Sequence, residues 1–286
     1  MNGIFRRFAE ADSVQIARCS ECSAMYVTPM VYFSEALQKE LYNIQYFESE
    51  GAVRDVKNIG EKRRILELTQ LCWGESLKGK TMLDIGCGTG EFLVTGSNFG
   101  MTVIGTDVDT SISKFIHDKY GFRVITEPFG PTTFPKESFD VIVLSHVIEH
   151  LQKPADLLGA IHTTLKPQGL FVMCTPNADS LMEKVHNIYG RIRHERTRSY
   201  YLTPFTSPYH IVGFNLKSSR RILQRTGFSP VYCKLHSGLE WEDVNRKFVM
   251  RTIKIAGAIL GQGMSLVTVS RKAQVPEGQM DWTLSA

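Results

Sequence analysis

The chain has 286 residues, of which 43% are hydrophobic and 22% are charged, a composition that supports one large buried core and a small additional element. The net charge of +4 is too small for the strong positive field of a dedicated nucleic-acid binder. Glu10 and Asp12 interrupt the first residues before an apolar signal region forms, and the longest apolar run, near residues 255–260, is far too short to span a membrane. Six irregularly spaced cysteines do not suggest a disulfide framework. We therefore expect a cytoplasmic protein without a membrane partner.

Two regions differ in their hydrophobic pattern. Residues 1–55 are expected to form a leader, followed by an amphipathic helix over residues 60–73. From residue 80 onward, apolar β-branched runs alternate with helical segments, which predicts a parallel sheet covered on both faces. The expected strands lie at 80–86, 101–107, 122–126, 139–145 and 169–175, and the helices between them at 90–99, 110–119 and 153–165.

The alternation stops at residues 177–214, a segment rich in Arg, Tyr and Pro. Such a segment predicts an insert over the strand ends, a candidate lid, rather than further sheet. After it we expect a helix at 217–226, a strand at 229–236, a helix at 243–260, a last strand at 264–271 and a tail at 273–286.

A glycine-rich turn follows the first expected strand of the sheet, with the sequence Asp84-Ile85-Gly86-Cys87-Gly88-Thr89-Gly90. Its glycines permit a tight strand-to-helix turn and a close approach of ligand to backbone. The dinucleotide fingerprint has a different glycine spacing and binds a pyrophosphate, which Asp84 would repel. A carboxylate there suits a ligand with a cationic amino-acid tail. The second strand ends at Asp107, where an acid can accept both hydroxyls of a ribose. An adenosine with a cationic tail describes S-adenosylmethionine.

Four segments, LDIGCGTGEF, GTDVD, FDVIVLSHVIEHL and LKPQGLFVMCTPN, occur in the order in which the class I methyltransferases carry them. The chain resembles this class over about residues 60–272, and most closely its quinone O-methyltransferases and its sugar and natural-product methyltransferases. The resemblance implies a three-layer Rossmann-like α/β fold with a mostly parallel seven-stranded sheet whose last strand is antiparallel, within a domain of residues 56–272. The cofactor-binding residues that it implies are Asp84, Gly86, Cys87, Gly88, Gly90, Asp107, Val108, Ser145 and His146.

The function that the resemblance implies is methyl transfer from S-adenosylmethionine to a small-molecule hydroxyl of a sugar, quinone-like compound or natural product. The alternatives are an RNA or protein methyltransferase, or a catalytically silent binding protein. A nucleic-acid acceptor is not favoured, because the chain lacks the Asn-Pro-Pro-Tyr string of amino-group nucleic-acid methyltransferases. One departure concerns adenine, because the segment after the third strand offers only Glu127 or the ring of Phe129 for its recognition.

His146, Glu149 and His150 follow the fourth strand and would share one face if the segment is helical. As a bare string this is the H-x-x-E-H of inverted zinc proteases, which the surrounding sheet pattern contradicts. In the quinone O-methyltransferases the equivalent E-x-x-E-H is associated with a divalent metal, so a zinc-like ion is one interpretation. The interpretation that we favour has no metal, with Glu149 and His150 capping or bracing the helix and lining the cofactor pocket.

His210 lies in the segment Tyr209-His210-x-x-x-Phe214, which resembles an acceptor-facing segment of the same families. His150 and His210 are therefore the candidate catalytic bases, because histidine titrates near neutral pH. A structural role is the alternative for each. The insert also carries Arg191, Arg193, Arg196 and Arg198 among tyrosines. These arginines are either a solvated loop or a clamp for an anionic acceptor.

Cys19 and Cys22 form a C-x-x-C pair that resembles half of the zinc ribbon preceding some sugar methyltransferases. A structural zinc site needs four ligands, and no other Cys or His precedes Cys72. We therefore favour a metal-free leader over a zinc ion shared by two chains.

Overall fold

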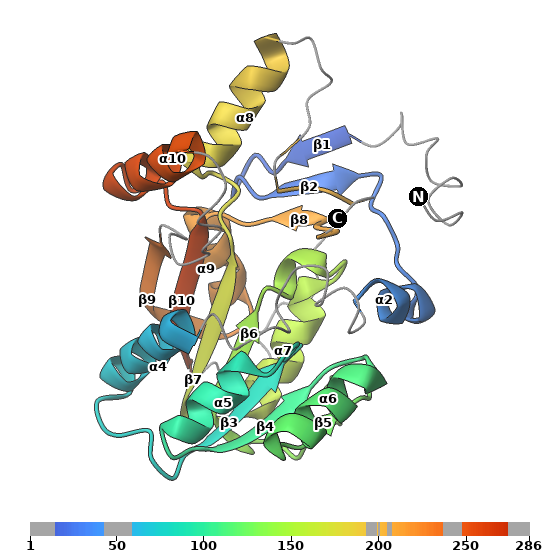
Figure 1. The fold of residues 1–286 in the computed structure, drawn as a ribbon, viewed down its shortest axis with the longest axis vertical. Helices are drawn as coiled ribbons and strands as arrows, with labels where there is room; N and C mark the ends of the chain where they lie inside the picture. Colours follow the sequence, from blue (N-terminus) through green and yellow to red (C-terminus); the bar gives the residue numbers. More distant parts are fainter. Residues whose placement is uncertain are drawn as a thin grey trace.

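The main feature of the computed structural model, which describes residues 15–42, 59–192, 199, 201–204, 208–236 and 248–273, is a seven-stranded sheet (Figure 1). Its strands in spatial order are β5 (Val124–Ile125), β4 (Thr102–Thr106), β3 (Thr81–Ile85), β6 (Phe139–Ser145), β7 (Leu165–Pro176), β10 (Ser265–Lys272) and β9 (Phe228–His236). Only β10 runs antiparallel to its neighbours β7 and β9. The predicted sheet, with its last strand antiparallel, is confirmed.

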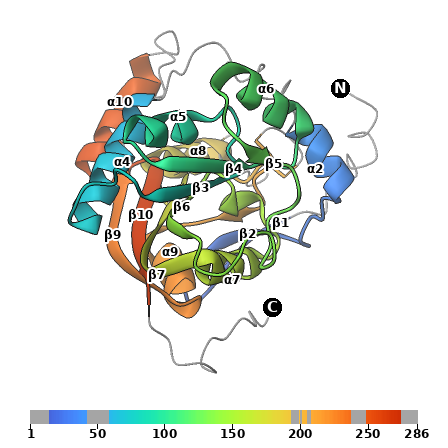
Figure 2. The same ribbon diagram turned by 90° about the horizontal axis from the view of Figure 1, so that it is seen from below.

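Helices cover both faces of this sheet, because side chains that alternate along each strand are apolar on both sides. Met82 of β3 packs in a cluster with Leu66, whereas its neighbour Leu83 packs on the opposite face in a cluster with Leu158. Figure 2 shows α4 and α5 on one side of the sheet and α7 and α9 on the other. The helix bounds are α4 Ile59–Trp73, α5 Glu91–Asn98, α6 Thr110–Tyr120, α7 Pro154–Thr164 and α9 Leu216–Arg225. The three layers match the predicted architecture.

A second, smaller sheet joins the amino-terminal segment to the insert. It consists of β1 (Gln15–Arg18), β2 (Met25–Thr28) and β8 (Val212–Gly213). Met25 pairs with Gly213 across β2 and β8, and Figure 1 shows this sheet beyond one end of the large sheet. The first strands of the expected leader and the last residues of the expected lid insert therefore share one sheet.

The remaining described helices are α2 (Glu35–Leu41), the 3-10 turn η2 (Ile148–His150), α8 (Leu181–Ile192) and α10 (Phe248–Ile259). Two local expectations differ from the structure. The strand expected at 122–126 is ordered as a strand only at β5, and the segment from His146 is no α-helix, because His146 has a φ of 56° and only η2 follows. Residues 243–247 of the expected last helix and residues 274–286 of the tail lie outside the described residues.

Among the described residues, no helix combines the length and the apolar character needed to cross a bilayer.

Candidate functional site

The glycine-rich turn connects β3 to α5 at the carboxyl end of the sheet. Gly86, Gly88 and Gly90 all have positive φ angles, of 68°, 48° and 83°, which residues other than glycine rarely adopt. At Gly86 space is the second constraint, because a Cβ atom would lie 2.5 Å from Cγ2 of Val147. The turn is thus packed directly against the segment that follows β6.

The sequence predicts Cys87, in this turn, as a cofactor-binding residue. Its side chain is buried and packs instead with Leu93, Ile112 and Ile116 between α5 and α6. A cofactor at the turn would therefore meet the backbone of Cys87 rather than its thiol. The backbone N–H of Cys87 already donates to the carbonyl oxygen of Thr106.

Asp84 is buried at the end of β3, and its Oδ1 atom has no hydrogen-bond partner among the described residues. Burial, together with the negative charges of Asp107 and Glu91, raises the pKa of Asp84 to about 7, although Lys62 opposes the shift. An unsatisfied buried carboxylate oxygen is costly without a donor. This atom is where a cationic ligand group would be stabilised.

Lys62 of α4 provides the cation of this cluster, and its residue surface is only 6% exposed. Its Nζ atom lies 3.4 Å from Glu61 Oε2 and 3.9 Å from Glu91 Oε2. Although burial opposes the shift, these two carboxylates raise the pKa of Lys62. Glu61, Asp84 and Glu91 thus outnumber the single lysine, so the cluster has an excess of negative charge when they are ionised.

Asp107 follows β4 and faces the same turn. Its Oδ2 atom accepts from the backbone N–H of Gly88 at 3.0 Å, and its Oδ1 atom accepts from the N–H of Asp109 at 3.2 Å. Burial raises the pKa of Asp107 to about 6, although these backbone hydrogen bonds favour the ionised form. The carboxylate is held in place beside the glycine turn, and Val108 next to it is half-buried.

The segment after β5 contains the two candidates for adenine recognition. Glu127 is exposed, whereas Phe129 is half-buried and packs against the core, with its ring centroid 6.3 Å from that of Phe134. The aromatic candidate is therefore the better placed of the two to form one wall of a pocket.

Glu149, in η2, lies at the centre of a group of histidines, and only 1% of its surface is exposed. Its Oε1 atom lies 3.3 Å from His146 Nδ1 and 3.8 Å from His210 Nε2, and its Oε2 atom accepts from Thr175 Oγ1 at 3.1 Å. Burial alone would raise the pKa of Glu149, but the hydrogen bond and charge of His146, with the charges of His150 and His210 when these are protonated, lower it to about 2. Glu149 is consequently a buried carboxylate that is ionised at neutral pH.

His210 is buried beside this carboxylate. Its Nδ1 atom lies 2.9 Å from the carbonyl oxygen of Tyr201, which can only accept a hydrogen bond. The proton of the neutral ring therefore sits on Nδ1, and Nε2 keeps its lone pair. Burial, together with the charge of His150, lowers the pKa of His210 to about 4. His210 is thus neutral at physiological pH, with an unprotonated nitrogen facing Glu149.

His150 packs against His210, with ring centroids 4.8 Å apart. Its Nδ1 atom lies 3.0 Å from the hydroxyl oxygen of Tyr42 and 3.4 Å from the carbonyl oxygen of Tyr209. Burial lowers the pKa of His150, although Glu149 opposes the shift. The two predicted bases therefore come together, as expected, from segments 60 residues apart.

The predicted cofactor residues His146 and Ser145 lie between the two ends of the site. The backbone N–H of His146 donates to the carbonyl oxygen of Cys174, and the Ser145 side chain hydrogen-bonds the Cys174 thiol. The charge of His146 lowers the pKa both of Glu91, beside the glycine turn, and of Glu149, in the histidine group. It thereby connects the expected donor and acceptor sides.

One group of potential metal ligands occurs in the described part of the chain. Glu149, His150 and His210 each offer one ligand atom, and these atoms lie within 4.8 Å of one another. His146, which the sequence grouped with Glu149 and His150, is not part of this set. Cys19 and Cys22 remain a pair, which leaves the expected metal-free leader a prediction.

The residues that the sequence reasoning missed are Lys62 and Thr175. Lys62 lies three residues before Ile65 and four before Leu66, so it shares the apolar stripe of α4. A lysine on a buried helix stripe was a signal of a charged partner. Thr175 gave no such signal, because it ends an apolar run. Of the insert's expected basic cluster, residues 193–198 lie outside the described residues.

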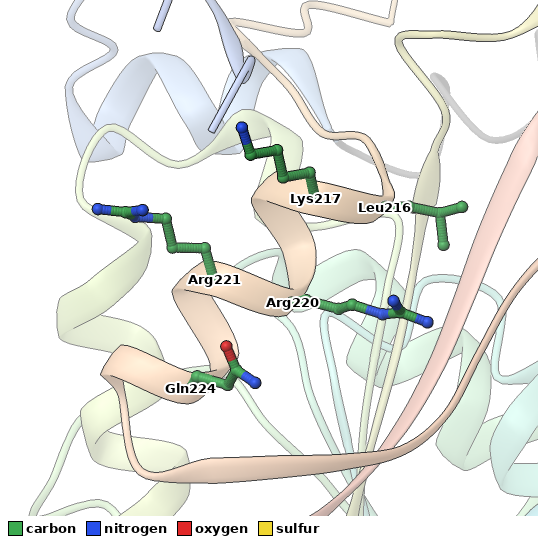
Figure 3. Close-up of a pocket in the computed structure, with 5 residues that line it drawn as sticks. All are labelled: Leu216, Lys217, Arg220, Arg221 and Gln224. Carbon is green, nitrogen blue, oxygen red and sulfur yellow. The ribbon is translucent and has the colours of Figure 1, made fainter. Parts of the chain in front are cut away.

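A basic pocket of about 420 Å³ lies on α9 and is lined by Leu216, Lys217, Arg220, Arg221 and Gln224 (Figure 3). None of the predicted site residues lines it. Arg221 is paired with Glu21 of the amino-terminal segment. This pocket is therefore distinct from the site at the strand ends.

Comparison with known proteins places the chain in a family. Residues 58–232, more than half of the chain, match the family model described as a methyltransferase domain. A ubiquinone biosynthesis O-methyltransferase of Bradyrhizobium sp. (strain ORS 278) is 35% identical over 107 residues, which cover 35% of this chain and 42% of the relative. The homologous enzyme of Bradyrhizobium diazoefficiens is 30% identical over 58% of this chain and 62% of its own length. The chain thus spans less than two thirds of these relatives.

Solved structures agree with this fold. A SAM-dependent methyltransferase from Archaeoglobus fulgidus superposes with a TM-score of 0.53 at 22% identity, covering 79% of this chain and 99% of that one. A geranyl diphosphate C-methyltransferase from Streptomyces coelicolor A3(2) gives 0.53 at 15% identity, covering 73% and 81%. From the strand order, the glycine turn and the family match, the chain belongs to the methyltransferase-domain family and has the class I S-adenosylmethionine-dependent methyltransferase fold.

Proposed function

We propose that this protein transfers a methyl group from S-adenosylmethionine to a hydroxyl of a small molecule, in first place a quinone-like or phenolic one. The observation that carries the proposal is the position of the buried Glu149–histidine group directly beside the glycine turn, with Val147 touching Gly86. A donor site and a proton-accepting site are thereby adjacent. The names of the related O-methyltransferases support a hydroxyl acceptor.

The donor end has the chemistry that the cofactor needs. Asp84 Oδ1, which has no hydrogen-bond partner among the described residues, would accept from the ammonium group of the cofactor, and Asp107 would accept from its ribose hydroxyls. Lys62 would balance the carboxylate of the cofactor. The excess of acidic side chains around Lys62 suits a ligand with two cationic centres, the ammonium and the sulfonium. When bound, S-adenosylmethionine supplies a methyl group already activated on a sulfonium.

The acceptor end then has two tasks, alignment and proton removal. His210 accepts the hydroxyl proton at Nε2, because Tyr201 holds the ring proton on Nδ1. The resulting imidazolium lies 3.8 Å from the ionised Glu149, which stabilises the charge that develops. Glu149 is itself oriented by Thr175.

A metal-assisted variant uses the same residues. Glu149, His150 and His210 would suit a divalent, zinc-like ion, and its chemistry would be to acidify the hydroxyl. We favour the metal-free version because His210 has a free Nε2 beside an ionised carboxylate, an arrangement that suffices for a base.

The proposal is tested in two steps. Titration calorimetry with S-adenosylmethionine and its demethylated product should give micromolar binding or tighter, and Asp107→Ala should weaken it by about 1.5–3 kcal/mol for bonds to a charged group. Transfer of a labelled methyl group into a panel of phenols, catechols, sugars, RNA and peptides then identifies the acceptor. No heat with either ligand would overturn donor use. Labelling of RNA or protein alone would overturn the small-molecule acceptor, and binding without any transfer would indicate a silent binding protein.

A further inference from the structure

The turn between β1 and β2 carries the C-x-x-C motif of Cys19 and Cys22, which the proposed methyl transfer does not use. The carbonyl oxygen of Cys19 accepts from the N–H of Ser23 at 2.9 Å. This hydrogen bond is of the helical type, which places residues three apart on the same side of the chain. The N–H of Cys19 donates to the carbonyl oxygen of Ala24 at 2.8 Å. The backbone of the turn thus brings the two cysteine side chains together.

The two thiols are in direct contact, because a hydrogen bond joins their sulfur atoms. The backbone N–H groups of Cys22 and Glu21 also donate to the sulfur of Cys19. Hydrogen bonds of this kind favour a thiolate, and they lower the pKa of Cys19. Burial raises the pKa of Cys22, although the N–H of Ala24 opposes the shift. The arrangement distinguishes the two sulfurs and makes Cys19 the better nucleophile.

The position of the turn leaves both thiols within reach of a small solute. Cys19 and Cys22 are half-buried, and the two residues between them are exposed. Cys87 and Cys174, by contrast, are buried in the core.

Polar contacts outside the motif hold the turn against α9. Glu21 pairs with Arg221 of that helix. The Asn215 amide, at the amino-terminal end of α9, donates to the carbonyl oxygen of Ser23 at 2.8 Å. None of these contacts involves a sulfur atom, so we expect the turn to keep its place when either thiol is replaced.

We propose that Cys19 and Cys22 are a reversible dithiol–disulfide pair that reacts with low-molecular-weight disulfides. The Cys19 thiolate attacks one sulfur of the small disulfide, which forms a mixed disulfide and releases one small thiolate. The Cys22 sulfur then attacks the Cys19 sulfur, which closes the Cys19–Cys22 bond and releases the second. The proton of each cysteine passes to a released thiolate, so the protein is oxidised by two electrons and the small disulfide is reduced to two thiols. The inference is independent of the proposed methyl transfer.

The test uses the full-length protein, whose zinc content is measured before any chelator is added. After dialysis against chelator, the protein is incubated with mixtures of reduced and oxidised glutathione, and its free thiols are blocked with N-ethylmaleimide. Mass spectrometry then follows the tryptic peptide that contains both cysteines. We expect this peptide to become unalkylated and two hydrogens lighter as the oxidised fraction increases, and dithiothreitol should reverse the change. Two alkylated cysteines at every ratio would overturn the proposal.

The single variants test the order of the two steps. Cys22→Ser keeps the attacking thiol without its partner, so it should accumulate a mixed disulfide with glutathione on Cys19. Cys19→Ser should form a mixed disulfide severalfold more slowly. Cys72→Ser is the matched control, because Cys72 is also half-buried but burial raises its pKa, and this variant should behave as the wild type. Equal rates in Cys19→Ser and Cys22→Ser would overturn the assignment of Cys19 as the nucleophile.

The metal measurement separates the pair from a shared zinc site. One zinc ion for every two chains in the purified protein, with both thiols resistant to oxidised glutathione until the metal is removed, would overturn the proposal in favour of a metal site between chains. Protein that contains no zinc and closes the disulfide would support it.

Discussion

The carbonyl oxygen of Tyr201 lies 2.9 Å from Nδ1 of His210 and thereby leaves Nε2 as the reactive nitrogen of that ring. The backbone of Tyr201 is fixed in turn, because its N–H donates to the carboxylate of the buried Glu183. The orientation of the proposed base thus depends on the segment after α8, and not only on the strand ends.

His210→Gln should therefore lower turnover by about a hundredfold or more, the usual range for a lost general base. Donor affinity should stay constant, because His210 is on the acceptor side. High pH should partly restore the rate with an acidic hydroxyl acceptor. Steady-state kinetics with calorimetry measure both quantities. His162→Gln is the matched control, because both histidines are 7% exposed but His162 packs on Phe228 away from the site. Equal rates in the two variants would contradict the assignment.

Chelation distinguishes the two acceptor mechanisms. In the metal-free version, extensive treatment with a chelator leaves turnover unchanged, and added divalent ions do not increase it. In the metal version, turnover disappears and the ions restore it, while the donor Kd remains the same in both. The measurement is the transfer rate before and after dialysis against chelator, with Glu149→Gln as the variant that weakens metal binding.

Donor binding should depend on pH through Asp84. Its pKa of about 7 in the free protein means that it is partly protonated at neutral pH, and an ammonium group binds only the carboxylate. Binding should therefore release a proton, and the apparent Kd should rise as the pH falls below about 7, approaching tenfold per unit.

Calorimetry at pH 6.5 in phosphate and in bis-Tris, which differ in ionisation enthalpy, counts the released protons. Lys62→Gln should move the midpoint to higher pH, because Lys62 opposes the upward shift of the Asp84 pKa. An affinity that is independent of pH between 6 and 8 would show that Asp84 does not meet the donor's cation.

Two aspartates of the same sheet should affect stability in opposite directions. Because the pKa of Asp84 is raised from 3.8 to about 7, its ionisation destabilises the folded protein. This destabilisation is absent below about pH 3.8, grows as the pH rises, and is complete above about pH 7. The difference between these two pKa values corresponds to a loss of about 4 kcal/mol in the free energy of unfolding. Asp84→Asn should thus raise Tm at pH 8 without donor, and the gain should vanish near pH 4.

Asp140→Asn is the counterpart. Asp140 accepts hydrogen bonds from Thr81 and pairs with Lys166 at 2.9 Å, and although burial opposes the shift, these contacts lower its pKa. Its carboxylate therefore stabilises the fold above the unfolded pKa, so this substitution should lower Tm at pH 8. Thermal melts of both variants against pH check the two signs, and a lower Tm for both would contradict the Asp84 argument.

The large sheet was predictable because its strands are continuous apolar runs bounded by glycines and acids, as at Asp84 and Asp107. The proximity of Asp107 to the glycine turn was predictable from the same pattern, because the two neighbouring strands end there. Lys62 of α4 was not predicted, and the role of these residues in donor binding stays a prediction. The smaller sheet was not, because β8 has only two residues and its pairing with β2 is set by tertiary contacts. The contact between Tyr42 and His150 is equally non-local, and no periodicity reports it.

The turn at His146 shows a different limit. The spacing of His146, Glu149 and His150 fits a helix, but the packing of Val147 on Gly86 and the positive φ of His146 produce a 3-10 turn instead. Propensity and spacing do not include such a close contact. His146 Nδ1 nevertheless lies 3.3 Å from Glu149 Oε1, so the two side chains still interact although the backbone is not an α-helix.

The insertion of β10 between β7 and β9 affects how the chain is synthesised. During translation β9 is complete well before Ser265–Lys272, yet among the described residues β10 is its only partner in the sheet. Until β10 emerges from the ribosome, one edge of β7 and the edge of β9 that pairs with β10 lack their final hydrogen bonds, which makes them sites for misassociation. Native pairing on this side of the sheet therefore has to wait for the last described strand.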